Sequence, residues 1–146
     1  MANLSENRKA RFDYVVLENF TAGLELKGFE VKSAKSGHAN LAGAQAIFRG
    51  GEFWLVGVDI PPYQAKNTPK DYDGARSRRL LLNREEINYL SGKLREKGLS
   101  LIPLKLFLKN NLIKVELALV RHKNKTDKRE LIKKEIARRE MKNIRS

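Results

Sequence analysis

Two clusters of basic residues carry the clearest chemical signal in the sequence. They lie in NRKARF (7–12) and ARSRRLLLN (75–83), and their cationic members are Arg8, Lys9, Arg11, Arg76, Arg78 and Arg79. The planar guanidinium group of arginine binds phosphate oxygens through two parallel hydrogen bonds. The two clusters therefore predict contacts with a phosphate-rich polyanion.

Two aromatic residues, Tyr63 and Tyr72, lie just before the second cluster, in the Pro- and Gly-rich segment 61–74. That composition predicts an exposed loop, and an exposed aromatic ring can stack on an unpaired base. Any single cation is more often a solvated surface group. The two clusters and the rings together favour RNA as the polyanion.

The net charge of the chain supports this interpretation. Its 30 Lys and Arg residues against 17 Asp and Glu residues give a formal charge of +13. The last 26 residues hold 11 of these basic and 4 of these acidic residues, so more than half of the excess lies in this tail. Such a balance indicates nucleic acid or an anionic membrane surface. We predict no membrane partner, because no apolar run has a spanning length and the tail lacks an interfacial apolar face.

Residues for catalysis are sparse. His38 and His122 are far apart in sequence and have polar surroundings. The spacing of Asp59, Asp71 and Asp73 does not fix a metal ion, so a metal-dependent nuclease is a weaker hypothesis than solvated loop residues. No phosphate-binding glycine loop with its lysine is present. The absence of cysteine excludes disulfides, thiol catalysis and Cys-ligated zinc, and it fits a reducing compartment. We expect no enzyme, no cofactor and, since no secretory signal is visible, a cytoplasmic protein.

The segments around the basic clusters must position them, and most of them are β-rich. Strands are expected over 13–20 and 23–26, with a bend at 19–23, and in two hairpins over 41–60 and 99–120. Gly50-Gly51 and Asn110-Asn111 would supply the hairpin turns, since Gly and Asn tolerate positive φ.

Two helices are expected beside these strands, over 28–37 and 83–98. Asn83 and Glu86 predict a capping box for the second helix, and Gly98 is a suitable residue beyond its end. About six strands and two helices predict a mainly β protein with flanking helices, of the α+β class. A small OB-like barrel over 1–121 is the first expectation, followed by a basic tail over 122–146.

The tail has helix signals without a core-facing surface. Asp127 and Glu130 predict a capping box, and Lys134, Arg138, Lys142 and Arg145 form a basic stripe on one face of the helix. No continuous apolar stripe accompanies it, and helices depend mainly on packing for their stability. We therefore expect the tail to be disordered when free and helical when a polyanion orders it.

The sequence resembles the SsrA-binding protein family, also called small protein B. The resemblance covers nearly the whole chain, and its strongest motifs are NRKARFDY (7–14), AGLELKGFEVKSAKSG (22–37), IPPY (60–63), RSRRLLLNREEI (76–87) and DKR (127–129). Shorter matches, such as ANL (39–41) and GE (51–52), occur in the same order between them.

The resemblance implies an RNA-binding adaptor for ribosome rescue. Members of this family bind transfer-messenger RNA through its tRNA-like domain and bring it, with elongation factor Tu, to bacterial ribosomes stalled on incomplete messages. The body would hold the tRNA-like domain. The tail would enter the small-subunit decoding centre and become helical in the empty mRNA channel. The adaptor would act as a monomer in the cytoplasm.

The resemblance and the basic clusters together give the predicted binding residues. Those for the tRNA-like domain are Asn7, Arg8, Lys9, Arg76, Arg78, Arg79, Leu81 and Asn83. Those for the ribosome are His122, Lys123, Asp127, Lys128, Arg129, Lys134, Arg138 and Lys142. Thr126 stands where the family often has an aromatic residue or His, and His122 is a candidate for the stacking role of that position.

Two other functions remain open from the residues alone. An OB-like body with a basic tail also fits a ribosome-associated assembly or structural factor that binds ribosomal RNA. A general binder of single-stranded RNA is the third reading.

Overall fold

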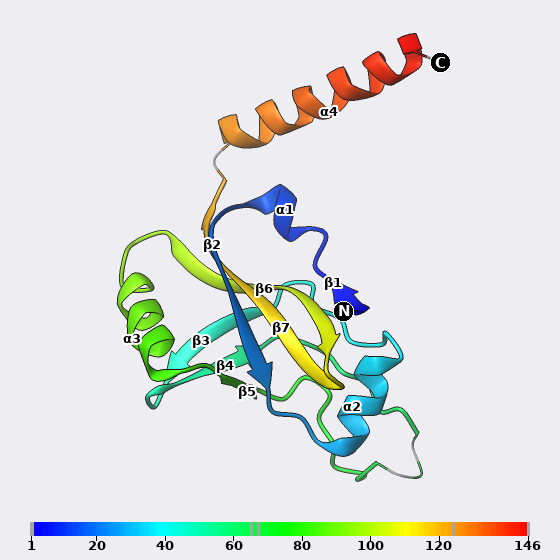
Figure 1. Cartoon of the computed structure of the whole chain (residues 1–146), viewed down its shortest axis with the longest axis vertical. Coiled ribbons are helices and arrows are strands. Elements are labelled where there is room, and N and C mark those ends of the chain that lie inside the picture. The colour runs from blue at the N-terminus through cyan, green and yellow to red at the C-terminus, as the bar shows by residue number, and fades with distance from the viewer. Residues whose placement is uncertain (1, 65, 67, 124, 146) are drawn as a thin grey trace.

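The computed structural model describes the backbone of residues 2–64, 66, 68–123 and 125–145, and the side chains of these residues except 11, 125–128 and 142–145. The strands are β1 (Ala2–Glu6), β2 (Tyr14–Leu24), β3 (Gln45–Arg49), β4 (Glu52–Val56), β5 (Arg78–Leu81), β6 (Leu99–Lys109) and β7 (Leu112–His122). The helices are α1 (Ala10–Asp13), α2 (Gly28–Lys35), α3 (Arg84–Lys93) and α4 (Lys125–Arg145). Figure 1 shows α4 projecting from a body built around the strands.

Six of the seven strands in the described residues close into a barrel. The strand order is β1-β6-β3-β4-β5-β2-β7, and a further pairing of β6 with β7 joins the two sides. The contact of β3 with β6 is a single pair, Ala46 with Leu101, whereas β6 and β7 pair along almost their whole length. This architecture confirms the predicted mainly β, OB-like body.

Both predicted hairpins are present with the expected turns. Gly50 and Gly51 join β3 to β4 with φ values of +61° and +81°. Asn110 and Asn111 join β6 to β7 with φ values of +51° and +63°. Positive φ at both central residues gives the turn a twist that matches the twist of paired strands, which is why these two dipeptides were informative in the sequence.

The start of the chain differs from the prediction. Residues 14–24 form one continuous strand with a register shift between Val16 and Glu18, so the expected bend at 19–23 is wrong. The partner strand β7 is equally long and pairs with β2 from Tyr14 to Gly23, and this pairing overrides the turn-forming composition. The sequence analysis also missed β1, which pairs with β6, and α1.

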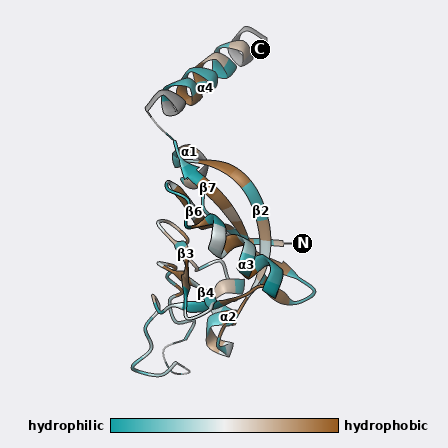
Figure 2. Cartoon of the chain, turned by 90° about the vertical axis from the view of Figure 1, so that its left-hand side faces the viewer, coloured by the Kyte–Doolittle hydropathy of each residue, from teal (hydrophilic) through white to brown (hydrophobic). Residues whose placement is uncertain are grey.

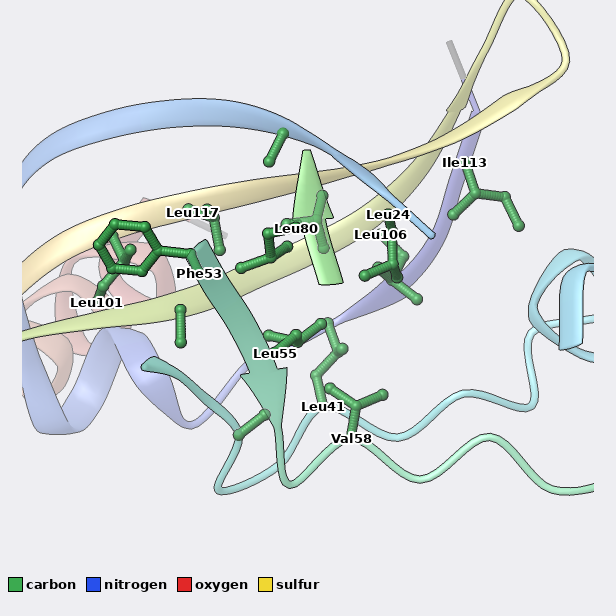
Figure 3. Close-up of a cluster of buried hydrophobic side chains, with 14 of the residues drawn as sticks. Leu24, Leu41, Phe53, Leu55, Val58, Leu80, Leu101, Leu106, Ile113 and Leu117 are labelled. Carbon is green, nitrogen blue, oxygen red and sulfur yellow. The ribbon is translucent and has the colours of Figure 1, made fainter. Parts of the chain in front are cut away.

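The core fills the barrel with side chains from every wall. Figure 3 shows Phe53, Leu55, Leu80, Leu106 and Leu117 meeting inside it, and all five are fully buried. Helix α3 adds Ile87 and Leu90 to the same cluster. A smaller cluster of Ala10, Ile102, Ala118 and Val120 attaches α1 to β6 and β7, so the segment before β2 is held against the body.

We predict that Leu106→Ala lowers the free energy of unfolding by about 2–5 kcal/mol, because it removes buried methyl groups and leaves a cavity. Leu112→Ala is the matched control, since Leu112 is 60% exposed on the adjacent strand, and its effect should stay within about 0.5 kcal/mol. Urea unfolding followed by circular dichroism measures both. Equal losses in the two variants would contradict the assignment of the core.

Candidate nucleic-acid interface

The second arginine cluster lies partly inside the body. Arg78 is completely buried, and its Nε and Nη2 donate to Glu30 Oε2 at 2.8 and 2.6 Å. Its other hydrogen bonds go to the carbonyls of Val58, Arg76 and Gly74 and to the Tyr72 hydroxyl. The prediction that Arg78 contacts RNA phosphates is therefore wrong, because its guanidinium has no exposed surface and is satisfied by the protein.

Arg76 is drawn into the same network. Its Nε donates to Glu30 Oε2 at 3.1 Å, its Nη2 donates to Glu30 Oε1, and its Nη1 donates to the carbonyl of Ser77 at 3.3 Å. The phosphate contact predicted for Arg76 stays a prediction because 28% of its side chain is exposed, but all three nitrogens already have protein acceptors. The sequence could not reveal this, since the acidic partner lies 46 residues earlier on α2.

Glu30 is the centre of this network. Its side chain is fully buried in α2, and it also accepts from the backbone amide of Lys27 at 2.9 Å and from the Tyr72 hydroxyl at 3.0 Å. Burial raises the pKa of Glu30, but hydrogen bonds from Arg76, Lys27 and Arg78 together outweigh burial and lower the pKa from 4.5 to about 2. The carboxylate is therefore charged at neutral pH.

Tyr72 also turns inward. Its hydroxyl donates to the carbonyl of Ile60 at 2.7 Å, its ring meets Phe29 edge-on at 4.8 Å, and burial followed by the bond to Glu30 raises its pKa. The Tyr72 ring is half-buried, so its stacking on a base stays a prediction. Tyr63, by contrast, is 45% exposed and remains available.

Arg79, Leu81 and Asn83 stay at the surface around β5. The guanidinium of Arg79 lies 3.5 Å from Glu25 and 3.4 Å from Glu52, both exposed or half-exposed pairs. Such pairs contribute little stability, so Arg79 can exchange them for a phosphate.

Leu81 is 47% exposed and lies opposite Gly23 of β2. A Cβ at Gly23 would stand only 3.2 Å from the Cβ of Leu81, so the bare backbone of β2 gives the leucine side chain its room. An exposed leucine beside exposed cations is suited to contact with a ribose or a base.

Asn83 has a structural role as well as a predicted binding role. Its Oδ1 accepts from the Glu86 amide at 2.8 Å, and Glu86 Oε1 accepts from the Asn83 amide at 3.2 Å. The predicted capping box is confirmed. The helix ends at Lys93, earlier than expected, and Gly98 with φ +86° lies in the connection to β6.

The first basic cluster lies at the junction of β1 and α1. The Asn7 side chain donates to the carbonyl of Pro103 at 3.1 Å and its backbone amide donates to that of Leu104 at 2.8 Å, which fixes this junction to β6. Arg8 and Lys9 are exposed beside it. A cavity of about 690 Å³ next to Asn7 and Arg8 is also lined by Asn19 and Lys105. The second arginine cluster does not contribute to this cavity, so the predicted body residues form two separate groups.

The body continues two residues into the predicted tail. Tyr14 pairs with His122 at the end of the β2–β7 ladder, and the two rings lie 4.5 Å apart at 44°. The amide of Lys123 then donates to the carbonyl of Asp13 at 3.0 Å. His122 and Lys123 are thus held by the body, and helix α4 begins after them at Lys125.

Helix α4 follows, and Figure 2 shows it leaving the body through a single stretch of chain. Arg129, Lys134 and Arg138 are exposed on it. Arg138 donates twice to Glu135, at 3.0 and 2.9 Å, an exposed pair within one helix. The predicted residues Asp127, Lys128 and Lys142 have side chains outside the described part of the chain.

The helical form of the tail agrees with its sequence signals, although it begins at Lys125 rather than after Asp127. Ile132, Ile136 and Met141 remain 46%, 50% and 58% exposed, and none of the described side chains of α4 belongs to either core cluster. A shallow cavity that includes Phe12 of α1 lies beside Ile132 and Ile136. The disorder of the free tail stays a prediction.

Among the described residues, no group of three His, Cys, Asp or Glu side chains could hold a metal ion. His38 is exposed and lies apart from His122. In the same part of the chain, no helix combines the length and the apolar character needed to cross a membrane.

Comparisons with known proteins agree with this arrangement. The family model described as SmpB protein matches residues 4–146. The chain belongs to the SmpB family. A relative from Thermosynechococcus vestitus, named SsrA-binding protein, is 49% identical over 138 residues, which cover 94% of this chain and 91% of the relative. The protein of the same name from Synechococcus elongatus is 50% identical over 127 residues, which cover 87% and 82% of the two chains.

A solved structure also resembles this SmpB-family chain. It is described as "tmRNA-SmpB: a journey to the center of the bacterial ribosome", with a TM-score of 0.68 and 41% identity over 87% of this chain and 92% of that one. The family resemblance seen in the sequence is therefore confirmed. Glu30 is the residue that sequence reasoning missed, although its place inside the matched motif GFEVKS was a usable signal.

We predict that Glu30→Gln lowers the free energy of unfolding at pH 7 by about 3–5 kcal/mol, because two guanidinium groups lose their buried counter-charge. Because the folded pKa of about 2 lies below the ordinary value of 4.5, the ionised carboxylate stabilises the fold fully above pH 4.5. This contribution, about 3 kcal/mol, is lost as the pH falls from 4.5 towards 2.

Urea unfolding at pH 7, 4.5 and 3 measures this dependence, with Glu140→Gln on exposed α4 as the control. The difference between the parent protein and Glu30→Gln should shrink as the pH is lowered. A difference that stays constant down to pH 3 would show that Glu30 is not the titrating group.

Proposed function

We propose that the chain is an RNA-binding adaptor that binds transfer-messenger RNA and acts with it on stalled bacterial ribosomes in trans-translation. Membership of the SmpB family, with the SsrA-binding proteins as relatives and the tmRNA-SmpB structure as the structural neighbour, is the observation that carries this function. The formal charge of +13 supports RNA as the partner.

The body is proposed to hold the tRNA-like domain of the RNA. Arg79, Leu81 and Asn83 would form one contact group and Asn7, Arg8 and Lys9 the other. Arg76 and Arg78 support the first group from within, because the same β5 segment carries Arg78 into the interior and Arg79 and Leu81 to the surface. This division explains why one cluster of arginines contains both structural and binding residues.

The tail is proposed to act on the ribosome. Lys134, Arg138 and Lys142 of the basic stripe would face ribosomal RNA in the decoding centre and mRNA channel. Lys123 and the DKR motif of Asp127, Lys128 and Arg129 would join them. An RNA-walled channel supplies phosphates along a helix that has no apolar partner. The His122 ring already contacts Tyr14 in a tilted arrangement, so a stacking role in the decoding centre would require this contact to open.

Elongation factor Tu would join the complex through the RNA, and the protein would work as a monomer in the cytoplasm. Purification of the tagged protein from a bacterial lysate, followed by RNA sequencing, tests the proposal. One dominant tRNA-mimicking RNA is the expected result. Ribosomal RNA alone would favour an assembly factor, and a broad mixture would favour a general RNA binder.

We predict that a chain ending after Lys123 folds and binds the tRNA-like domain as the parent does but does not support peptide tagging. The truncation keeps the last bonds of the β2–β7 ladder, including the amide of Lys123 to the carbonyl of Asp13. Thermal melts, gel shifts and a tagging assay with ribosomes stalled on a message without a stop codon measure the three properties. Loss of RNA binding would contradict the separation of body and tail.

We predict that charge and helicity of the tail are both required for tagging. Reversal of Lys134, Arg138 and Lys142 to Glu should abolish tagging and leave the melting temperature and tmRNA binding nearly unchanged. Ala at the three positions removes the charges and keeps the helix, whereas Arg138→Pro keeps most of the charge and breaks the helix at a cost of about 3 kcal/mol. If Arg138→Pro tags as efficiently as the parent, the helix is not needed.

A further inference from the structure

A small pocket lies at the end of the body opposite to α4. It has a volume of about 360 Å³ and is lined by Lys27, Gly28, Phe29, Lys32, Tyr63 and Gln64. In Figure 1, α2 and the long loop after β4 lie together at the lower end of the molecule, while α4 lies at the upper end. None of the lining residues belongs to the tail or to either group of predicted body residues.

Two aromatic rings, Phe29 and Tyr63, line this pocket. Phe29 is held from behind by the edge-on contact with Tyr72, whose hydroxyl is bound by Ile60 and Glu30. Tyr63 is 45% exposed and belongs to neither core cluster. An exposed ring can present its flat face to a planar ligand, because it does not need to leave a core in order to bind.

The charge of the pocket has one sign. Its ionisable lining residues are Lys27 and Lys32, and no carboxylate lines it. Neither ammonium group forms an ion pair with any residue that the structure describes. The neighbouring carboxylate Glu30 points the other way, into the body, where Arg76 and Arg78 neutralise it. The pocket thus offers two uncompensated cations to an anion.

We propose that this pocket binds an unpaired nucleotide of transfer-messenger RNA, with the base stacked on Tyr63 and the phosphate between Lys27 and Lys32. Stacking on aromatic rings combined with flanking cations is the physical basis of single-stranded RNA recognition. The inference rests on the proposed function for the identity of the RNA. It adds a third contact region, at the end of the body that faces away from the tail.

Acidic peptide is the other ligand that two lysines could attract, but the geometry favours a nucleotide. A carboxylate would satisfy the ammonium groups and leave the exposed ring of Tyr63 without a role. A nucleotide uses both features, since its base has an aromatic face and its phosphate carries the charge. The proposed partner of the body is also RNA, so nucleotides of that RNA are close to the pocket when the complex forms.

Binding of full-length transfer-messenger RNA to four variants tests the proposal. Tyr63→Ala should raise the Kd by about 5- to 100-fold, the range expected for the loss of one stacked base. Tyr63→Phe should retain the parent Kd. Lys27→Ala and Lys32→Ala should each reduce the slope of log K against log[salt] by up to about one. Lys97→Ala, an exposed lysine after α3, is the control, and thermal melts should show that all variants are folded.

A photo-crosslinking residue at position 63 then identifies the partner. The expected product is a crosslink to one nucleotide of transfer-messenger RNA. A crosslink to ribosomal RNA or to a protein instead would overturn the assignment of the pocket. If the parent protein binds the RNA and Tyr63→Ala binds it equally well, this inference fails alone. If the parent protein does not bind transfer-messenger RNA, the proposed function fails with it.

Discussion

The buried carboxylate of Glu30 is the interaction on which the rest of the body depends. A charged group in a protein interior requires paired charges and hydrogen bonds, and Glu30 receives them from Arg76, Arg78, Tyr72 and the first turn of α2. These partners come from the end of the loop after β4 and from β5. The network therefore fixes α2, the loop and β5 together, and it sets which residues of β5 face solvent.

The alternation of side chains along β5 determines which of its residues reach the surface. With Arg78 turned towards Glu30, Arg79 and Leu81 must lie on the outer side of the short strand β5, since successive side chains point to opposite faces. Leu81 then lies over the bare backbone of Gly23. Tyr72, another member of the network, contacts the ring of Phe29. Phe29 lines the same pocket as exposed Tyr63. One buried ion cluster thus positions two different parts of the surface.

Body and tail follow opposite physical rules. The body buries apolar side chains inside a closed barrel and holds its chain up to Lys123 by strand pairing. Helix α4 keeps Ile132, Ile136 and Met141 largely exposed and carries cations along its length. A helix without a buried face depends on its surroundings for stability. Its helical form is therefore suited to regulation by an RNA partner, whereas the barrel has a buried core of its own.

The sequence by itself determined the features that depend on neighbouring residues. Gly50-Gly51 and Asn110-Asn111 specified the hairpins, Asn83 and Glu86 specified a helix cap, and the ordered family motifs specified the SmpB family. Only the tertiary structure decided which of the arginines are buried and which are exposed. Arg76, Arg78 and Arg79 look alike in sequence, but a carboxylate 46 and 48 residues away bonds two of them and holds Arg78 in the interior. Long-range pairing likewise made residues 14–24 one strand, because the energy of a contact depends on distance in space and not on separation along the chain.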